Sequence, residues 1–292
     1  MTRVEVLTPG ALTTIQDLGR PGWAHIGVPR SGAADRPALR LANSLVGNGE
    51  NAAALETTLA GPRLRFDGPA VAALTGAPAP VRVADRTVGM NEVFAVAAGD
   101  ELRIGNASAG LRTYLAFRGG IAVPLVLGSA ATDLLTGLGP EPLTRGDLLD
   151  LSTDDRGGRT MRSPAPELPP LDELPDSVIL RVIVGPRSDW FTDESVKRLL
   201  REPFRVDQAS NRIGIRLRGP EFRRTRADEL PSEGLVPGAI QVPADGQPIV
   251  LLTDHPTTGG YPVVAVVHSE DLALAAQLRP GQRLYFAASE AG

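Results

Sequence analysis

Short apolar runs rich in β-branched residues alternate with turn residues along most of the chain. The runs that we expect to form strands are Val4–Leu7, Leu64–Phe66, Val71–Leu74, Val81–Val83, Val93–Val96, Leu102–Ile104, Leu111–Phe117, Val178–Val184, Ile213–Leu217, Ile249–Leu252 and Val263–Val267. Many short strands with frequent turn signals are typical of β-barrels and sandwiches rather than of a doubly wound sheet. The pattern therefore predicts a mainly β protein with few helices.

Helical periodicity is clear in two segments. Asp35–Val46 begins with an aspartate suited to an N-cap, has a proline in its first turn and ends before Gly47. Thr192–Arg201 begins with a threonine, followed by acidic residues in the first turn and basic ones in the last. That order of charges complements the helix dipole. Both segments are predicted to be short helices.

A break in composition separates two regions. Residues 154–177 contain five prolines, many charges and few strand formers. Such a segment cannot take part in a regular strand ladder and is typical of an extended linker. We therefore expect an N-terminal β lobe over residues 1–153, a proline-rich linker over 154–177 and a C-terminal β-barrel lobe over 178–292.

Composition excludes several classes of protein. The chain has no cysteine, which excludes disulfides, thiolate metal sites and a cysteine nucleophile. Its three histidines are not spaced as metal ligands, and we expect no metal site. The net charge of −4 and the lack of a basic run argue against nucleic-acid binding. No apolar run is long enough for a membrane span and no signal pattern is visible, so we expect a cytoplasmic protein.

The basic residues restrict the chemistry further. Of the 30 Lys and Arg residues only Lys197 is a lysine, and it lies in a pattern typical of a solvated helix face. No Walker-type phosphate loop, nucleophile elbow or zinc-protease motif occurs. Any anion that the chain binds is therefore expected to be held by arginine or by backbone N–H groups.

The first segment with candidate chemistry runs from residue 16 to residue 48. It has glycines that permit tight turns, and Ser31 and Asp35 introduce a helix whose N-terminal N–H groups can hold an anion. The same pattern also fits a turn-rich loop with an ordinary helix cap.

The second candidate segment combines SNRIGIRLRGP with LPSEGLVPGAIQV. Asn211 and Arg212 precede an expected strand, and Glu233 stands between small residues. A carboxylate within reach of an arginine can act as a base or as an ion-pair partner. A solvent-facing hairpin tip explains the pattern equally well.

The third candidate segment is DHPTTGGY, residues 254–261. Thr257 and Thr258 followed by Gly259 and Gly260 can form a cradle of hydroxyl and amide groups for a carboxylate or a phosphoryl group. Asp254 can orient a donor, and Tyr261 can offer a phenol or a stacking face. Two glycines alone are also a common turn. The residues by themselves indicate two β lobes with polar loops suited to a small anionic ligand, and they name no reaction.

These segments, taken in order, resemble the allophanate hydrolase subunit 2 family, also called carboxyltransferase subdomains A and B. The resemblance rests on TIQDLGRPGWAHIGVPRSGAADRPALRLANSLVGN, ALETTLAGPRLRF, SNRIGIRLRGP, LPSEGLVPGAIQVPADGQPIVLLTDHPTTGGY and DLALAAQLRPGQRLYF. It covers nearly the whole chain apart from the linker. The family includes the C component of bacterial ATP-dependent 5-oxoprolinases, a Kip-type regulatory antagonist and part of the carboxyltransferase domain of urea carboxylase.

The resemblance implies a fold of two lobes built on cyclophilin-like β-barrels. It also implies a site completed by a partner of the subunit 1 type, the B component of the 5-oxoprolinases, in a heterodimer or heterotetramer. Glu233, Asp254 and Arg212 are the expected catalytic residues. The expected substrate-binding residues are Arg20, Ser31, Asp35, Asn211, Gln241, Thr257, Thr258, Gly259, Gly260 and Tyr261.

The sequence departs from the family pattern at several positions. Pro256 stands where a glutamine is usual, Ile215 replaces a tyrosine, and Ala34 replaces a methionine. Ala130 occupies the place of an arginine in a G-S-R-S-T loop. These changes leave an anion-binding role to Arg20, to Arg212 or to the partner.

Three functions follow from the resemblance. The first is the C component of an ATP-dependent 5-oxoprolinase, which is inactive alone and works with the B and A components on a small anionic substrate. It would use ATP with Mg²⁺, bound on this chain or on the partner. The second is a biotin-dependent carboxyltransferase or a component of the allophanate and urea pathway. No biotin would be attached to this chain, because Lys197 lies between Val196 and Arg198 and not in a biotin-attachment motif. The third is a regulatory protein that binds a kinase inhibitor.

Overall fold

The computed structural model describes residues 1–152, 176–185, 187–226 and 228–289. These residues form two compact units. Unit 1 consists of residues 1–20, 35–133 and 137–152, and unit 2 of residues 21–34, 134–136 and the described residues from 176 onward. Segments 21–34 and 134–136 thus belong to the same unit as the C-terminal region.

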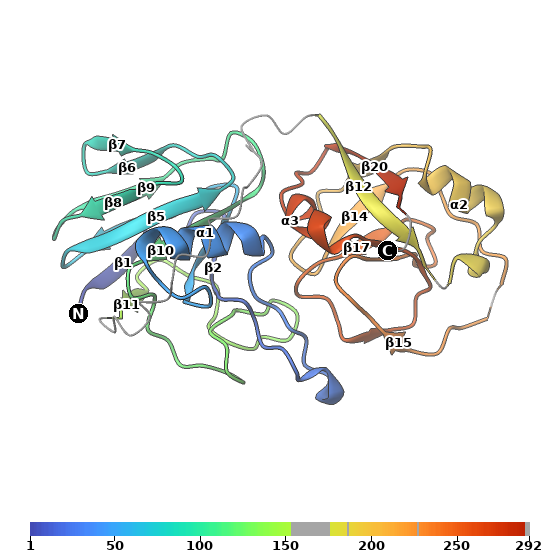
Figure 1. Cartoon of the computed structure of the whole chain (residues 1–292), viewed down its shortest axis with the longest axis horizontal. Coiled ribbons are helices and arrows are strands. Elements are labelled where there is room, and N and C mark those ends of the chain that lie inside the picture. The colour runs from blue at the N-terminus through green and yellow to red at the C-terminus, as the bar shows by residue number, and fades with distance from the viewer. Residues whose placement is uncertain (153–175, 186, 227, 290–292) are drawn as a thin grey trace. The chain divides into compact units, whose positions relative to one another are not determined.

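Unit 1 contains two antiparallel sheets (Figure 1). The order in the first sheet is β11-β1-β4-β9-β6-β7, and in the second β2-β3-β10-β5-β8. The first sheet comprises β1 (Arg3–Thr8), β4 (Arg63–Phe66), β6 (Val81–Val83), β7 (Arg86–Val88), β9 (Glu101–Ile104) and β11 (Leu148–Asp150). The second comprises β2 (Leu12–Gln16), β3 (Ala54–Thr58), β5 (Ala70–Gly76), β8 (Val93–Val96) and β10 (Arg112–Phe117).

The two sheets of unit 1 share one apolar core. Phe66 of β4 and Phe117 of β10 meet edge to face, with 5.9 Å between their ring centroids, and both are fully buried. Alternate residues of the flanking strands fill the space around these rings, as expected for strands with one buried face.

Helix α1 (Arg36–Val46) packs against β5 and β10 of unit 1 (Figure 1). Asp35 is its N-cap, and the carboxylate accepts a hydrogen bond of 3.0 Å from the Ala38 N–H. Gly47 ends the helix in the left-handed conformation, with φ of 81°. The predicted helix and both of its end signals are confirmed.

Unit 2 is built on a closed barrel with the strand order β12-β19-β16-β17-β14-β13-β20 (Figure 1). Its strands are β12 (Ser177–Val184), β13 (Phe204–Val206), β14 (Gly214–Arg218), β16 (Ala239–Gln241), β17 (Ile249–Leu251), β19 (Val263–Val267) and β20 (Arg283–Ala288). The mainly β prediction is confirmed. The closed barrel lies in unit 2, whereas the described strands of unit 1 form separate sheets.

Unit 2 also contains several short elements. The second predicted helix is confirmed as α2 (Asp193–Leu199), capped by Thr192. The others are α3 (Leu272–Ala275), the 3₁₀ turns η1 (Ala24–Ile26), η4 (Ser188–Trp190) and η5 (Ser269–Asp271), and a small separate sheet of β15 (Glu233–Gly234) and β18 (Thr258–Gly259).

Most of the predicted linker, residues 154–175, lies outside the described residues. Its last residue, Ser177, is the first residue of β12 and pairs with Arg283. None of the helices among the described residues combines the length and the hydropathy that crossing a membrane requires.

A close backbone approach in unit 1 gives a test of the fold. Gly10 has φ of +76°, and a Cβ there would lie 2.2 Å from the carbonyl oxygen of Ala60. Gly99 has φ of +86°, but a Cβ there would meet nothing within 4 Å. Both Gly→Ala changes carry the strain of a left-handed alanine, about 1–2 kcal/mol, and only Gly10→Ala adds a clash. We expect Gly10→Ala to lose at least about 1 kcal/mol more unfolding free energy than Gly99→Ala in urea denaturation followed by circular dichroism. Equal losses would contradict the packing at Gly10.

Candidate functional site

Two of the predicted site residues, Arg212 and Asp254, lie next to each other because they flank two paired barrel strands. Strands β14 and β17 are antiparallel, with Gly214 opposite Leu251. The ladder continues beyond both strands, since the Asp254 N–H donates to the Arg212 carbonyl at 3.1 Å. Arg212, which precedes β14, and Asp254, which follows β17, are therefore neighbours at one end of the barrel.

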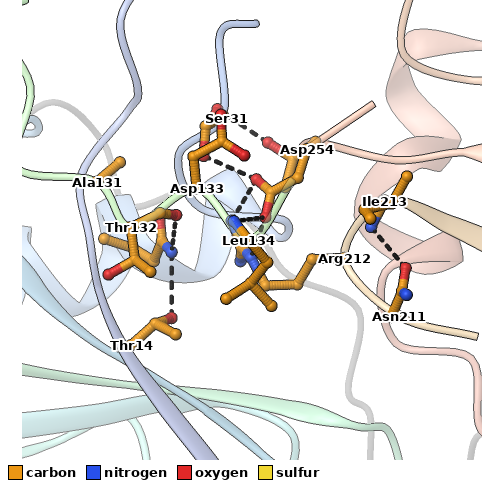
Figure 2. A network of polar contacts seen from close by, with 12 residues as sticks. Thr14, Ser31, Ala131, Thr132, Asp133, Leu134, Asn211, Arg212, Ile213 and Asp254 are labelled. Carbon is orange, nitrogen blue, oxygen red and sulfur yellow. Dashed lines mark hydrogen bonds and ion pairs between the residues drawn. The ribbon is translucent and has the colours of Figure 1, made fainter. Parts of the chain in front are cut away.

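The side chains of Arg212 and Asp254 form a buried ion pair (Figure 2). Arg212 Nε lies 2.9 Å from Asp254 Oδ2, and Arg212 Nη2 lies 3.0 Å from Asp254 Oδ1. The exposed fractions of the two side chains are 1% and 0%. This two-bond geometry is the strongest form of an arginine–carboxylate contact, and burial protects it from screening.

Two further donors complete the surroundings of Asp254. The Ser31 hydroxyl donates to Oδ1 at 2.7 Å, and the Leu134 backbone N–H donates to Oδ2 at 3.1 Å (Figure 2). Each carboxylate oxygen thus accepts one bond from the guanidinium and one from another group. A carboxylate so fully engaged is anchored in place and has little capacity left for a ligand.

The backbone at Ser31 and Gly32 is fastened to the same end of the barrel. Both residues are left-handed, with φ of 53° and 89°. This conformation is costly for serine. The Gly32 carbonyl accepts a bond of 2.7 Å from Arg212 Nη2, and the Thr253 hydroxyl donates to both the Ser31 and the Gly32 carbonyls. Arg212, Thr253 and Asp254 thereby hold segment 21–34 in unit 2.

A second polar cluster lies around the small sheet. Glu233 is opposite Gly259, and Gly234 is opposite Thr258. The Leu235 N–H donates to the Thr257 carbonyl at 2.9 Å, which extends the ladder. The turn predicted to form a cradle is thus placed directly beside the Glu233 backbone.

Gln241 supports this cluster from the barrel strand β16. Its side-chain amide donates to the Tyr261 carbonyl at 3.1 Å. A Cβ on Gly259 would lie 2.9 Å from that amide nitrogen and 2.9 Å from a Leu235 methyl group, so a larger residue here would have to displace the ends of these two side chains. Thr258, Gly260 and Tyr261 are exposed, and their groups are open to a ligand or a partner.

Glu233 is paired with Arg187, a residue that the sequence did not single out. Arg187 Nε lies 3.1 Å from Glu233 Oε2, and Arg187 Nη2 donates to Glu233 Oε1. The hydrogen bond from Arg187 is the main reason why the pKa of Glu233 lies below its usual value. Glu233 is therefore a carboxylate at neutral pH and an acceptor rather than an acid.

The remaining predicted residues take part in other contacts. The side chain of Asn211 accepts from the backbone N–H groups of Ile213 and Gly214, which is a turn contact. Arg20 and Asp35 belong to unit 1. Arg20 is buried, donates to the Ala131 carbonyl and lies 3.9 Å from the carboxylate of Asp133.

Asp35 belongs to a buried network in unit 1. Its N–H donates to the Tyr114 hydroxyl at 2.7 Å, and that hydroxyl donates to Glu56 at 2.8 Å. Burial is the main cause of the raised pKa of Tyr114, so the phenol stays protonated. Within unit 1 this network joins the start of α1 to the sheet beneath it.

The buried ion pair in unit 2 gives a prediction about stability. Removing one partner takes the two-bond ionic contact away from the other buried charge, so Arg212→Met and Asp254→Leu should each cost about 3–5 kcal/mol of unfolding free energy. The double variant should cost clearly less than the sum, because no unpaired charge remains. The fluorescence of Trp190, buried in the same unit, can follow unfolding in urea. Additive losses would show that the two side chains do not depend on each other.

Comparison with known proteins agrees with the predicted resemblance. The sequence profile of the carboxyltransferase domain, subdomain A and B, matches residues 26–288. The chain is 39% identical over 286 residues to the C component of 5-oxoprolinase from Escherichia coli (strain K12), and the match covers 97% of this chain and 90% of that protein.

The chain is also similar to one part of the urea amidolyases, which are much longer proteins. The chain is 38% identical to urea amidolyase of Lachancea kluyveri over 97% of its own length and 17% of that protein. The crystal structure of the K. lactis urea amidolyase superimposes with a TM-score of 0.90 at 34% identity, over 99% of this chain and 19% of that one. The chain therefore belongs to the family of carboxyltransferase domains, subdomain A and B.

Proposed function

We propose that the chain is the C component of an ATP-dependent 5-oxoprolinase, which opens 5-oxoproline to glutamate together with partner proteins. The observation that carries the proposal is the 39% identity to the E. coli C component over 90% of that protein. The match to urea amidolyase reaches only 17% of that enzyme. A partner of the B-component type, and an A component, would complete the assembly, which we place in the cytoplasm.

We place ATP and Mg²⁺ on a partner protein. Magnesium bound with a nucleotide needs only one or two carboxylates, because phosphate and water oxygens complete its coordination. The described residues include no group of three or more histidine or acidic side chains that could hold a metal ion without a nucleotide. The sequence also lacks a Walker-type phosphate loop. The chain alone is then inactive, and its own residues bind and orient the lactam.

Opening a lactam requires stabilisation of the negative charge that develops on the amide oxygen. Backbone N–H groups held in place beforehand suit this task. The turn from Thr257 to Gly260 is exposed at Thr258 and Gly260 and is anchored by Gln241 and by its ladder with β15. We propose that this turn faces the substrate, with Glu233 beside it as the acceptor.

Arg212 and Asp254 take a different role in this proposal. Both are buried and bonded to each other, so a substrate carboxylate would have to displace Asp254 to reach the guanidinium. We propose that they are positioning residues, which hold Ser31, Gly32 and the neighbouring backbone. Anion binding then falls to exposed groups of unit 2 and to the partner.

A biotin-dependent carboxyltransferase is the second candidate function, because the urea amidolyase of Lachancea kluyveri matches almost the whole chain at 38% identity. Biotin would be carried by a separate protein in that case. The two functions differ in the substrate and in the need for a biotinylated carrier.

Reconstitution tests the proposed function directly. The purified chain, mixed with its B-component and A-component partners, should hydrolyse ATP only when 5-oxoproline is present. Omitting any one of the three proteins should abolish phosphate release. The absence of hydrolysis dependent on 5-oxoproline would refute the proposal, and an avidin-sensitive activity that appears only after a biotinylated carrier protein is added would favour the carboxyltransferase.

The role of Glu233 gives a second prediction. Glu233→Gln removes the charge but keeps the shape, and we expect the turnover number of the reconstituted complex to fall about 100-fold. Glu202 is the matched control, because it is also a half-exposed glutamate paired with an arginine in unit 2. Glu202→Gln should leave turnover within about twofold of the parent, as is usual for a surface substitution away from a site. Similar effects of the two variants would remove Glu233 from the site.

A further inference from the structure

The pair of Arg187 and Glu233 joins two segments that are far apart in the sequence. Arg187 lies between β12 and α2 and immediately precedes η4, whereas Glu233 is the first residue of β15. The guanidinium meets both carboxylate oxygens through Nε and Nη2. Such two-bond contacts fix the plane of the carboxylate as well as its position.

Among the described residues, few other contacts hold the short sheet that carries Glu233. Strands β15 and β18 have two residues each and form a sheet separate from the barrel. A ladder of this length has little stability of its own. Besides the ladder, its contacts include the bond from Leu235 to Thr257 and the support of Gln241 below the turn. The contact between Arg187 and Glu233, a side-chain clamp, is therefore expected to contribute strongly to holding the sheet of β15 and β18 in place.

A second arginine–glutamate pair in unit 2, Arg198 and Glu202, differs from the pair of Arg187 and Glu233 in the segments that it joins. Arg198 and Glu202 have almost the same geometry and exposure, with Nε–Oε1 and Nη2–Oε2 distances of 2.8 and 3.2 Å. They are four residues apart, with Arg198 in the last turn of α2 and Glu202 just beyond the helix, so this pair joins no segments that are distant in the sequence. Arg187, by contrast, binds the side chain of a residue whose backbone pairs with Gly259, in the turn that is exposed at Thr258 and Gly260.

We propose that Arg187 is a positioning residue, which holds the Glu233 carboxylate beside the turn of residues 257–260 as the acceptor for the N–H group of a lactam substrate. Each carboxylate oxygen has a second lone pair that the guanidinium does not use. The lactam part of the inference rests on the proposed function. The clamp itself rests on the geometry alone.

The electrostatics agree with this geometry. The bond from Arg187 lowers the pKa of Glu233, so the carboxylate stays ionised as the pH falls. Without Arg187 the pKa rises toward its ordinary value, and protonation sets in at a higher pH. The acidic limb of the activity profile should then move to higher pH.

Amide hydrogen exchange on the full chain tests the clamp without reference to the reaction. In Arg187→Met we expect the amides of 233–236 and 257–260 to exchange about threefold faster or more, whereas Arg198→Met should leave them unchanged. Unchanged exchange in Arg187→Met would overturn the clamp. Exchange that rises equally in Arg198→Met would do the same, because a remote surface pair would then have the same effect.

Turnover in the reconstituted complex tests the positioning role. Arg187→Met should lower turnover about tenfold and move the acidic limb to higher pH. Arg187→Lys should return the acidic limb of the pH profile to its position in the parent complex, because the positive charge is present again. It should restore only part of the turnover, because lysine cannot make two parallel bonds to the carboxylate. An Arg187→Met complex that behaves like the Arg198→Met complex would overturn the inference and leave the proposed function intact.

The two failures are distinguishable. If the parent complex has no hydrolysis dependent on 5-oxoproline, the proposed function and the lactam contact fail together. The exchange measurement then still decides whether Arg187 clamps Glu233.

Discussion

The organisation of unit 2 depends on the buried carboxylate of Asp254. A charge without solvent is costly unless it is paired and fully hydrogen-bonded, and Asp254 meets this condition through Arg212, Ser31 and the Leu134 N–H. These donors come from separate stretches of the chain, so the requirement of one carboxylate brings them to the same end of the barrel. A buried pair of this kind is weak evidence for net stability, and its consequence here is a specified arrangement of segments 21–34 and 134–136 in unit 2.

The same constraint separates the charged residues by role. Arg212 and Asp254 neutralise each other out of reach of solvent, whereas Glu233 and Arg187 are about one-third exposed beside an open turn. The buried pair therefore shapes the backbone, and the exposed pair is available for contacts with a substrate or a partner. A close relative with a different substrate can retain the first pair and change the second, because only the second meets the ligand in our proposal.

Local signals in the sequence were sufficient for α1, whose cap, first-turn proline and terminal glycine all lie within or next to the helix. They were also sufficient for the longer barrel strands, such as β12 and β19, which are rich in β-branched residues. Strands β15 and β18 have two residues each and carry no period that could be recognised. The sequence indicated Arg212 and Asp254 as polar candidates, but their mutual burial depends on the register of β14 and β17, which is long-range. Arg187 meets Glu233 across 46 residues, and nothing near either one in the sequence points to the other.

The exchange of the Arg212 Nε–H proton with solvent, followed by NMR on arginine-labelled protein, tests the central claim most directly. The resonance is assigned by its loss in an Arg212→Met variant. The account predicts slow exchange in the parent chain, fast exchange in Asp254→Asn, and no change when 5-oxoproline is added to the reconstituted complex. Fast exchange in the parent chain, or a shift of the resonance on adding 5-oxoproline, would show that Arg212 is open to ligands and would contradict the account.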